Sequence, residues 1–333
     1  MIYALFIRLK QFPSKLVKDN YRNINMKEHH NYVAFFLTSA CNLRCSYCIN
    51  DHDIGPRRNF SKSKHMPVDR WIKAANRLIL REDLPLTLQG GEPLLYKGFY
   101  KFVNEVKNEI KMDLLTNMMF DVDEFIQNVP VERFTRKAPY ASIRASYHPG
   151  ENDISGLIEK TIQMQEAGFK IGIYGILHPD SEIRADVLTA REKCLKNGLD
   201  FRTKEFLGSY NGSTYGTFKD NESVSNKIMK FCECKTTELI VGPGGDVYRC
   251  HADLYQGRSP IAHILDDDLT EAELDKFRAC NFYGSCNPCD VKVKTNRFQV
   301  FGHSSVEIRN VQNLKDNQTQ SSIREEKETL KIK

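Results

Sequence analysis

Three cysteines lie on one short stretch of this sequence, at Cys41, Cys45 and Cys48, in a C-x3-C-x2-C pattern. Three thiolates at this spacing can hold three irons of a cubane [4Fe–4S] cluster and leave the fourth iron open. An open coordination position is what a catalytic metal site needs. The alternative is zinc, which prefers four ligands in two pairs, but the spacing is uneven and the nearest further candidate ligand is His52.

Six more of the ten cysteines lie between residues 232 and 289, and Cys194 stands alone. The N-terminus has no continuous apolar stretch before a small-residue cleavage site, so no secretory signal is predicted. Cysteines grouped in this way indicate metal sites rather than a disulfide framework. Six thiolates are too few for two cubanes and more than one cubane needs, so we expect one auxiliary cluster, with structural zinc as the alternative.

A regular alternation of strand-like and helix-like segments begins at residue 32 and must position the first cysteine group. The predicted strands are Tyr32–Leu37, Leu84–Gln89, Met112–Thr116, Ala141–Ser146, Lys170–Leu177 and Leu199–Phe206. The predicted helices are Asp69–Leu80, Phe99–Ile110, Ser155–Ala167 and a segment around Ala190–Asn197. Six such units imply a parallel sheet but are too few for a closed eight-unit barrel, so we expect an α/β fold with a partial (β/α)6 TIM-like barrel.

The pattern divides the chain into four segments. These are an N-terminal appendage (1–30), the barrel (31–215), a small C-terminal module (216–305) and a polar tail expected to be disordered (306–333). The glycine- and serine-rich residues 208–216 are typical of a linker or loop. In the module, Glu238–Val241 and Asp246–Arg249 flank a glycine-rich turn, which predicts a β-hairpin. Because cysteines bracket this hairpin, we expect the module to bear the second metal site.

Two motifs together resemble those of the radical S-adenosylmethionine (SAM) superfamily. The cysteine pattern has an aromatic residue, Tyr47, just before its last cysteine, and the second strand ends in Gly90-Gly91-Glu92-Pro93, similar to the GGE motif of that superfamily. Both motifs lie at the carboxyl ends of predicted strands, where the loops of such a sheet form active sites. The resemblance covers roughly residues 31–207. It implies that Cys41, Cys45 and Cys48 bind a [4Fe–4S] cluster whose open iron binds SAM.

The resemblance also implies which residues contact SAM. Gly90 and Gly91 would let the backbone approach the methionine part of SAM, and Glu92 or the carbonyls beside it would accept hydrogen bonds from its ammonium group. Other candidate SAM-binding residues are Tyr47, Asn117, Arg144 and Ser146. For the strand-end residues, the alternatives are local hydrogen bonding and a structural ion pair.

The C-terminal cysteines resemble the SPASM and twitch extensions of radical SAM enzymes, which carry auxiliary [4Fe–4S] clusters. The resemblance rests on Cys234 or Cys232, then Gly245 and Cys250, and then a later C-x2-C pair. The cysteine series is shorter than that of SPASM, which favours the single-cluster, twitch-like form. The implied ligands are Cys234, Cys250, Cys286 and Cys289, with Cys232 and Cys280 as alternates. Cys280 is also a candidate hydrogen donor to a substrate radical.

The resemblance implies an enzyme that reductively cleaves SAM to a 5′-deoxyadenosyl radical, which abstracts hydrogen from a substrate. Our first hypothesis for the substrate is a small metabolite, such as a sugar, a sugar nucleotide or a cyclitol, that is dehydrogenated or epimerised. The second hypothesis is a maturase of a ribosomal peptide or protein. It ranks lower because thirty residues before the barrel are too few for a peptide-recognition module. A non-catalytic zinc protein is the third, but it leaves Gly90-Gly91-Glu92 unexplained.

Charge and hydropathy limit the partners and the location. The net charge is +5, most of it within residues 1–30, so the body of the chain is near neutral and lacks the basic stripe of a nucleic-acid-binding face. The apolar runs are too short to span a bilayer, so we expect no stable membrane insertion and a cytoplasmic location. The expected partners are a small-molecule substrate and an electron donor such as flavodoxin or ferredoxin, and no nucleic acid.

Overall fold

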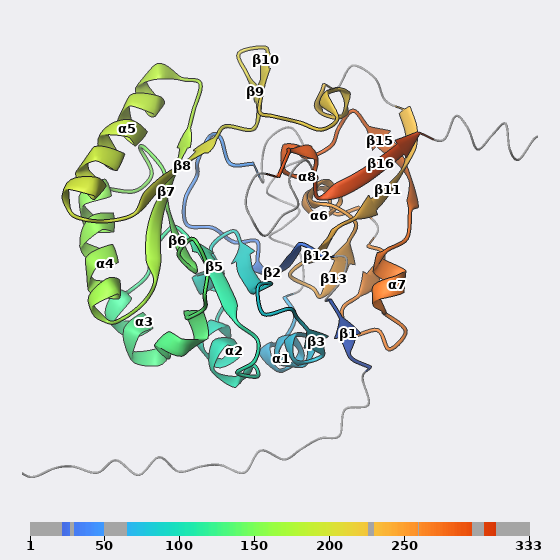
Figure 1. The fold of residues 1–333 in the computed structure, drawn as a ribbon, viewed down its shortest axis with the longest axis horizontal. Coiled ribbons are helices and arrows are strands. Elements are labelled where there is room, and N and C mark those ends of the chain that lie inside the picture. The colour runs from blue at the N-terminus through green and yellow to red at the C-terminus, as the bar shows by residue number, and fades with distance from the viewer. Residues whose placement is uncertain are drawn as a thin grey trace, which may run out of the picture.

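The computed structural model describes residues 22–26, 30–49, 65–225, 230–258, 260–294 and 303–310. Its centre is a nine-stranded sheet in the order β14-β13-β12-β2-β4-β5-β6-β7-β8 (Figure 1). The strands from β2 to β8 pair in parallel and form the predicted partial barrel, which is confirmed. They are β2 (Tyr32–Thr38), β4 (Leu86–Gly90), β5 (Met112–Thr116), β6 (Ile143–Tyr147), β7 (Ile171–Leu177) and β8 (Phe201–Glu205).

Helices cover the outer face of these parallel strands (Figure 1). Alternate strand residues point to opposite faces, so Phe35 points outward and its ring packs 4.8 Å from that of Trp71. Both side chains belong to one large core cluster between the sheet and the helices. The helices are α1 (Val68–Asn76), α2 (Phe99–Glu105), α3 (Val122–Asn128), α4 (Ile154–Glu166) and α5 (Ser181–Lys196), joined by the 3-10 turns η2 (Pro93–Leu95) and η3 (Val131–Phe134).

Helix boundaries differ from the sequence prediction at several ends. Helix α1 ends at Asn76 rather than Leu80, because β3 (Leu78–Ile79) pairs instead with β1 (Ile24–Asn25) of the expected N-terminal appendage. Helix α2 ends at Glu105, since Val106 takes an extended conformation. Helix α5 starts well before Ala190, capped by the carboxylate of Asp180. Helix α3 was not predicted from the sequence.

The predicted hairpin of the C-terminal module is present as β12 (Glu238–Val241) and β13 (Asp246–Tyr248), and it joins the barrel sheet. Strand β12 pairs in parallel with β2, and β13 pairs with β14 (Ala262–His263). Helix α6 (His251–Gln256) follows the hairpin and packs on the inner face of the barrel sheet. There the ring of Tyr255 lies 6.0 Å from that of Phe36, opposite to the face covered by α1. The module is therefore continuous with the barrel.

A second, three-stranded sheet completes the module. Its central strand β11 (Lys230–Thr236) pairs with β15 (Arg278–Tyr283) on one side and β16 (Val306–Asn310) on the other. Strand β16 lies in the segment that was expected to be a disordered tail. It was missed because its pairing partner, β11, is distant in the sequence. The expected linker at residues 208–216 is a small hairpin of β9 (Gly208–Tyr210) and β10 (Ser213–Tyr215). The remaining elements are η4 (Asn221–Val224), α7 (Glu271–Leu274) and α8 (Pro288–Val291).

None of the helices in the described ranges is long and apolar enough to cross a membrane.

Candidate active site and metal centres

The loop with the three N-terminal cysteines begins where β2 ends, at Thr38. Cys45 is buried, whereas Cys41 and Cys48 keep part of their surface accessible. The backbone N–H of Cys48 donates to the carbonyl of Cys45 at 3.2 Å, which closes a turn between the last two cysteines. The backbone N–H of Arg44 donates to the carboxylate of Glu151 at 2.7 Å and ties the loop to the segment after β6. The zinc alternative named His52, which lies outside the described residues.

Gly90 and Gly91 cross directly over the residues that lead into this loop. A Cβ atom on Gly90 would lie 2.0 Å from the carbonyl oxygen of Thr38, and one on Gly91 would lie 2.1 Å from that of Ala40. Gly90 also has a φ of +147°, which disfavours any side chain. The N–H of Gly91 donates to the Thr38 carbonyl at 3.0 Å. The glycines therefore bring the ends of β2 and β4 together beside Cys41, a contact that the sequence prediction did not include.

Glu92 is buried at the ends of β4 and β5, with 2% of its surface exposed. Its carboxylate accepts hydrogen bonds from the Thr116 hydroxyl and from the backbone N–H of Asn117, both at 2.8 Å. Burial raises the pKa of Glu92 to about 7, against the effect of these hydrogen bonds. The carboxylate is thus bonded to the protein itself and positions the end of β5, a contact that the sequence analysis did not predict.

The candidate residues on β5 and β6 fall into two groups. Asn117 lies beside the cysteine loop, where its Nδ2 donates to the side chain of Asn42 at 2.8 Å and lies 3.9 Å from Cys41 Sγ. Ser146 is partly buried, and its carbonyl accepts from Asn152 at 2.9 Å. Arg144 instead forms an ion pair with the buried Asp113 at 3.2 Å. The structural ion pair that was left open as an alternative is therefore present. Arg144 is the second residue of β6 and lies far from the carboxyl end of that strand.

The Tyr47 side chain belongs to an aromatic group at the mouth of the barrel. Its ring centroid lies 5.2 Å from that of His178, which in turn lies 4.7 Å from the rings of both Phe206 and Tyr210. The Tyr47 hydroxyl is also 3.4 Å from Nδ1 of His148. His178 and Phe206 are buried, so this aromatic group is packed in the interior. Neither this grouping nor the anchoring role of Glu151 was predicted from the sequence.

The C-terminal cysteines gather on one face of the second sheet. Cys232 and Cys234 are two residues apart on β11 and therefore share a face, and Cys280 of β15 is the cross-strand partner of Cys232. The three Sγ atoms lie within 4.8 Å of one another and are buried. Hydrogen bonds from Cys232 and Cys234 lower the pKa of Cys280, and the nearby Arg249 guanidinium adds to this effect. The register of the sheet brings Cys234, a ligand predicted from the sequence, together with its two alternates, Cys232 and Cys280.

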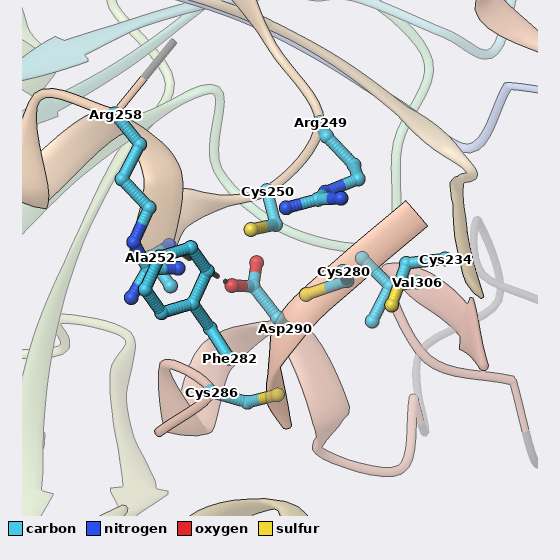
Figure 2. A pocket seen from close by; sticks show the side chains of 10 residues that line it. All are labelled: Cys234, Arg249, Cys250, Ala252, Arg258, Cys280, Phe282, Cys286, Asp290 and Val306. Carbon is cyan, nitrogen blue, oxygen red and sulfur yellow. Dashed lines mark hydrogen bonds between the residues drawn. The ribbon is translucent and has the colours of Figure 1, made fainter. Parts of the chain in front are cut away.

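A pocket next to these thiols is also lined by two further cysteines and an aspartate from other parts of the chain (Figure 2). Cys250 comes from the start of α6, Cys286 from the loop before α8, and Asp290 from α8. Arg249 lies beside them and donates to Asp253 at 2.7 Å. The pocket is lined by Cys234, Arg249, Cys250, Ala252, Arg258, Cys280, Phe282, Cys286, Asp290 and Val306. Cys280 therefore lines the pocket in which a ligand of an auxiliary cluster is expected, rather than the inner face of the barrel.

Cys289 differs from the sequence expectation, because it does not line this pocket. Asp290, its neighbour on α8, does line the pocket. Burial raises the pKa of Tyr255, and the neighbouring Cys289 and Cys48 add to the rise. Asn287, between the two cysteines of the C-x2-C pair, donates to the carbonyl of Ile49 at 3.2 Å.

Buried charged side chains connect the cysteine pocket with the barrel. Asp290 Oδ1 lies 2.8 Å from His251 Nδ1, and the ring of His251 packs 5.9 Å from that of Phe36. Nearby, Lys294 donates to Glu238 of β12 at 2.6 Å. Burial raises the pKa of Glu238, but Lys294 and His251 outweigh it and hold that pKa below its ordinary value. These pairs fix α6 and α8 against the inner face of the sheet.

Comparison with protein families gives a match to the Radical SAM superfamily over residues 35–186. This chain contains a radical SAM domain. The matched region runs from β2 to α5 and includes the cysteine loop and the Gly90–Glu92 crossing.

Curated relatives of this radical SAM protein include a GTP 3′,8-cyclase of Aliarcobacter butzleri, 23% identical over 189 residues, which are 54% of this chain and 56% of the relative. A GTP 3′,8-cyclase of Helicobacter pylori is 29% identical over 89 residues, 26% of this chain and 27% of that protein. An S-adenosylmethionine-dependent nucleotide dehydratase of Lacinutrix mariniflava is 26% identical over 92 residues, 28% of this chain and 19% of that protein. The chain therefore spans about half the length of the first relative and less of the others.

Among solved structures, the radical SAM protein is similar to native anSMEcpe with bound AdoMet and the Kp18Cys peptide. The TM-score is 0.48 at 14% identity, covering 73% of this chain and 79% of that one. It is also similar to Streptococcus suis SuiB bound to the precursor peptide SuiA, with a TM-score of 0.43 at 15% identity, covering 80% and 67% of the two chains.

The radical SAM domain binds a [4Fe–4S] cluster and SAM. The second cysteine-rich site lies in the C-terminal module, outside the matched region. The residues of both sites fit such a cluster. Burial raises the pKa of Cys45 to about 12, and the neighbouring Cys48, Glu151 and Cys41 add to the rise. Thiolates at this site therefore need a positive partner, which iron supplies. At the second site, burial likewise raises the pKa of Cys286 to about 12.

Proposed function

We propose that this radical SAM enzyme removes hydrogen from a small metabolite bound on the inner face of its barrel, in a dehydrogenation or an epimerisation. One observation carries the proposal. Helix α6 packs on the inner face of β2, with Tyr255 against Phe36, and Asn287 bonds to Ile49. The two cysteine sites thus flank one inner face that is partly covered, a setting suited to a small substrate.

In this proposal the N-terminal site prepares the reaction. Cys41, Cys45 and Cys48 would hold the cluster, which together with SAM and an electron supplies a 5′-deoxyadenosyl radical for hydrogen abstraction. Gly90 and Gly91 hold the strand ends close to the cysteine loop, and Glu92 fixes Asn117 beside Cys41. Ser146 and Tyr47 would bound the space for SAM. Arg144 is excluded from this set because it is paired with Asp113.

For the auxiliary cluster we propose the ligands Cys234, Cys250, Cys280 and Cys286. This set differs from the sequence-based one, since Cys280 lines the pocket and Cys289 does not. The Sγ atom of Cys232 lies 3.6 Å from that of Cys234, so Cys232 is the alternate ligand in place of Cys234. We accordingly assign Cys280 to the metal site rather than to hydrogen donation. The domain that carries the cluster would extend from about residue 216 through β16, to residue 310.

The relatives favour a small substrate, although they match only part of the chain. Two are named GTP 3′,8-cyclase and one is named a nucleotide dehydratase. Among the substrates considered from the sequence, a nucleotide-bearing metabolite such as a sugar nucleotide therefore ranks above a free sugar or a cyclitol. A peptide substrate, as a maturase would use, is the competing outcome. Turnover would also need a low-potential electron donor such as flavodoxin or ferredoxin.

The proposed function is tested by reconstituting the full-length protein with iron and sulfide under anoxic conditions. Two cubanes predict about eight irons per chain. With dithionite and SAM, the protein should form 5′-deoxyadenosine, and Cys45→Ala should lose that product. The matched control is Cys194→Ala, because Cys194 is buried in α5 within the outer core, away from both cysteine sites. Product formation by Cys45→Ala, or zinc in place of iron, contradicts the proposal.

A further inference from the structure

One arginine of the cysteine pocket carries a buried hydrogen-bond donor that no protein acceptor meets. Arg249 directly precedes Cys250 and lines the pocket together with Cys234, Cys280 and Cys286 (Figure 2). Only 9% of the surface of Arg249 is exposed. Its Nε is buried and has no hydrogen-bond partner among the residues that the structure describes. Because buried N–H groups in folded proteins are nearly always hydrogen-bonded, this donor indicates an acceptor that binds in the pocket.

The other two nitrogens of the Arg249 guanidinium are held by the protein. Nη1 donates to the backbone carbonyl of Ala279 at 2.7 Å, and Nη2 donates to Oδ2 of Asp253 at 2.7 Å. Ala279 belongs to β15 and directly precedes Cys280, so Arg249 connects the start of α6 with the second sheet. The guanidinium is planar and rigid, so these two bonds also fix the direction of its Nε–H.

Asp253, which orients Arg249, is itself fixed on two sides. Its Oδ1 accepts from Arg258 at 2.9 Å, and its backbone N–H donates to Cys250 Sγ at 3.4 Å. The Nε of Arg258 is also without a partner in the described chain, but this guanidinium stacks on Phe282, with its carbon 3.6 Å from the ring centroid (Figure 2). Two guanidinium groups thus share the carboxylate of Asp253, which leaves positive charge for an anionic group in the pocket.

We propose that Nε–H of Arg249 donates a hydrogen bond to a sulfur atom of the auxiliary cluster and thereby raises the reduction potential of that cluster. This inference rests on the proposed function, because it concerns the cluster assigned to Cys234, Cys250, Cys280 and Cys286. A cubane becomes more negative on reduction, so a cation and a hydrogen bond at its sulfur atoms stabilise the reduced form more than the oxidised one. Hydrogen bonds to sulfur are among the factors that set the potentials of such clusters.

The test is a potentiometric titration of the reconstituted full-length protein, monitored by electron paramagnetic resonance. The auxiliary cluster is fully ligated by cysteines, so its signal is the one that added SAM leaves unchanged. Arg249→Met removes the charge and the donor, whereas Arg249→Lys keeps the charge and removes Nε–H. Each variant should shift the reduction equilibrium toward the oxidised cluster by about tenfold, which lowers a one-electron potential by about 59 mV.

The matched controls are Arg309→Met and Arg309→Lys. Arg309 is the cross-strand partner of Glu233 and donates to its carboxylate at 2.6 Å. Glu233 lies between Cys232 and Cys234 on β11, so strand alternation places this pair on the face of the second sheet opposite to the cysteines. Both controls should keep the potential of the parent protein. Iron content and the thermal unfolding midpoint report whether each variant is folded and carries both clusters.

Two results with the variants would overturn the inference. One is a parental potential in Arg249→Met or in Arg249→Lys with both clusters assembled, since an unchanged lysine variant would mean that charge alone sets the potential. The other is an equal shift in the Arg309 controls. Pulsed electron paramagnetic resonance of parent protein grown with isotope-labelled arginine needs no variant. It should detect an arginine nitrogen coupled to the reduced auxiliary cluster, and absence of this coupling also overturns the inference.

Formation of 5′-deoxyadenosine separates this inference from the proposed function. Product formation together with an unchanged potential in both Arg249 variants refutes the role of Arg249 alone. A lowered potential in these variants, without product from the parent protein, contradicts the proposed chemistry and leaves the role of Arg249 standing. A parent protein that binds only about four irons per chain contradicts both, because the auxiliary cluster is then absent.

Discussion

The side-chain amide of Asn287 donates to the carbonyl oxygen of Ile49 at 3.2 Å. Ile49 directly follows Cys48, and Asn287 directly follows Cys286, so one hydrogen bond joins the two cysteine sites. Asn287 is fully buried, and its Oδ1 accepts from the N–H of Cys289 at 2.9 Å. The relationship fixes the C-terminal module against the loop that carries the N-terminal cysteines.

Replacing Asn287 by alanine should destabilise the junction between the sites. The change leaves a carbonyl and an N–H without partners in a buried position, which costs about 1–3 kcal/mol. Thermal unfolding of the reconstituted protein measures the loss. The matched control is Asn197→Ala at the exposed end of α5, where Nδ2 bonds only within the same helix turn. If both variants unfold at the same temperature as the parent protein, the hydrogen bonds of Asn287 do not stabilise the fold.

Gly91→Ala should disrupt the N-terminal cysteine site specifically. A Cβ at this position would lie 2.1 Å from the carbonyl oxygen of Ala40, so the cysteine loop must shift to admit it. We expect the iron content to fall from about eight to about four per chain, because only the N-terminal cluster is lost.

The control for Gly91→Ala is Gly156→Ala within α4, where the nearest atom to the added Cβ is the Asp153 carboxylate at 3.5 Å. Alanine is favoured over glycine inside a helix by about 0.5–1 kcal/mol, so this variant should be as stable as the parent protein or more so. Full iron occupancy in Gly91→Ala would show that the close crossing is not needed for cluster binding.

Much of the barrel could be predicted from the sequence, because its signals are local. The six parallel strands are short apolar runs, and Gly90 and Gly91 stand at the end of the second strand, where their lack of a side chain is required. The pairing of β12 with β2 could not be predicted, since it joins residues about 200 positions apart. For the same reason, β16 was assigned to a disordered tail: its five residues form a strand only because β11 is beside them.

The N-terminal cysteine site was easier to predict than the C-terminal one, for a related reason. Positions of the N-terminal cysteines follow from one loop, so their grouping is visible in the sequence. The choice among the C-terminal cysteines depends on the register of β11 with β15 and on which residues of α8 line the cysteine pocket. The contacts of Glu92 with Thr116 and Asn117 depend in turn on two strand ends that meet only in the fold.

Stability should fall as the pH rises from about 4.5 to about 7 because of Glu92. Burial raises the pKa of Glu92 to about 7 in the folded state, from an ordinary value of 4.5. In this window the folded protein binds more protons than the unfolded chain, so the free energy of unfolding decreases with pH, by an amount on the order of 3 kcal/mol. Denaturant unfolding of the reconstituted protein between pH 4.5 and 8 measures the trend.

The control for this pH dependence is Glu92→Gln, which removes the titrating group but can still accept from the N–H of Asn117. Its stability should vary less between pH 4.5 and 7 than that of the parent protein. Equal slopes in the two proteins would mean that the carboxylate of Glu92 does not carry the pH dependence.

The last prediction separates Cys280 from Cys289. Cys280 lines the cysteine pocket and lies with Cys232 and Cys234, whereas Cys289 belongs to neither group. Cys280→Ser should therefore lower the iron content by about four per chain, the content of one cubane. Cys289→Ser should keep about eight. Iron analysis and electron paramagnetic resonance of the reduced proteins measure both.

A cluster can recruit a substitute ligand, so retention of iron by Cys280→Ser needs a second comparison. The double variant Cys232→Ser with Cys280→Ser removes the thiol best placed to substitute, since the two residues are cross-strand partners. It should lose the auxiliary cluster while the N-terminal cluster and its spectrum persist, because Cys41, Cys45 and Cys48 belong to a separate loop. Loss of iron by Cys289→Ser, together with retention by the double variant, would restore the ligand set expected from the sequence and refute the one proposed from the structure.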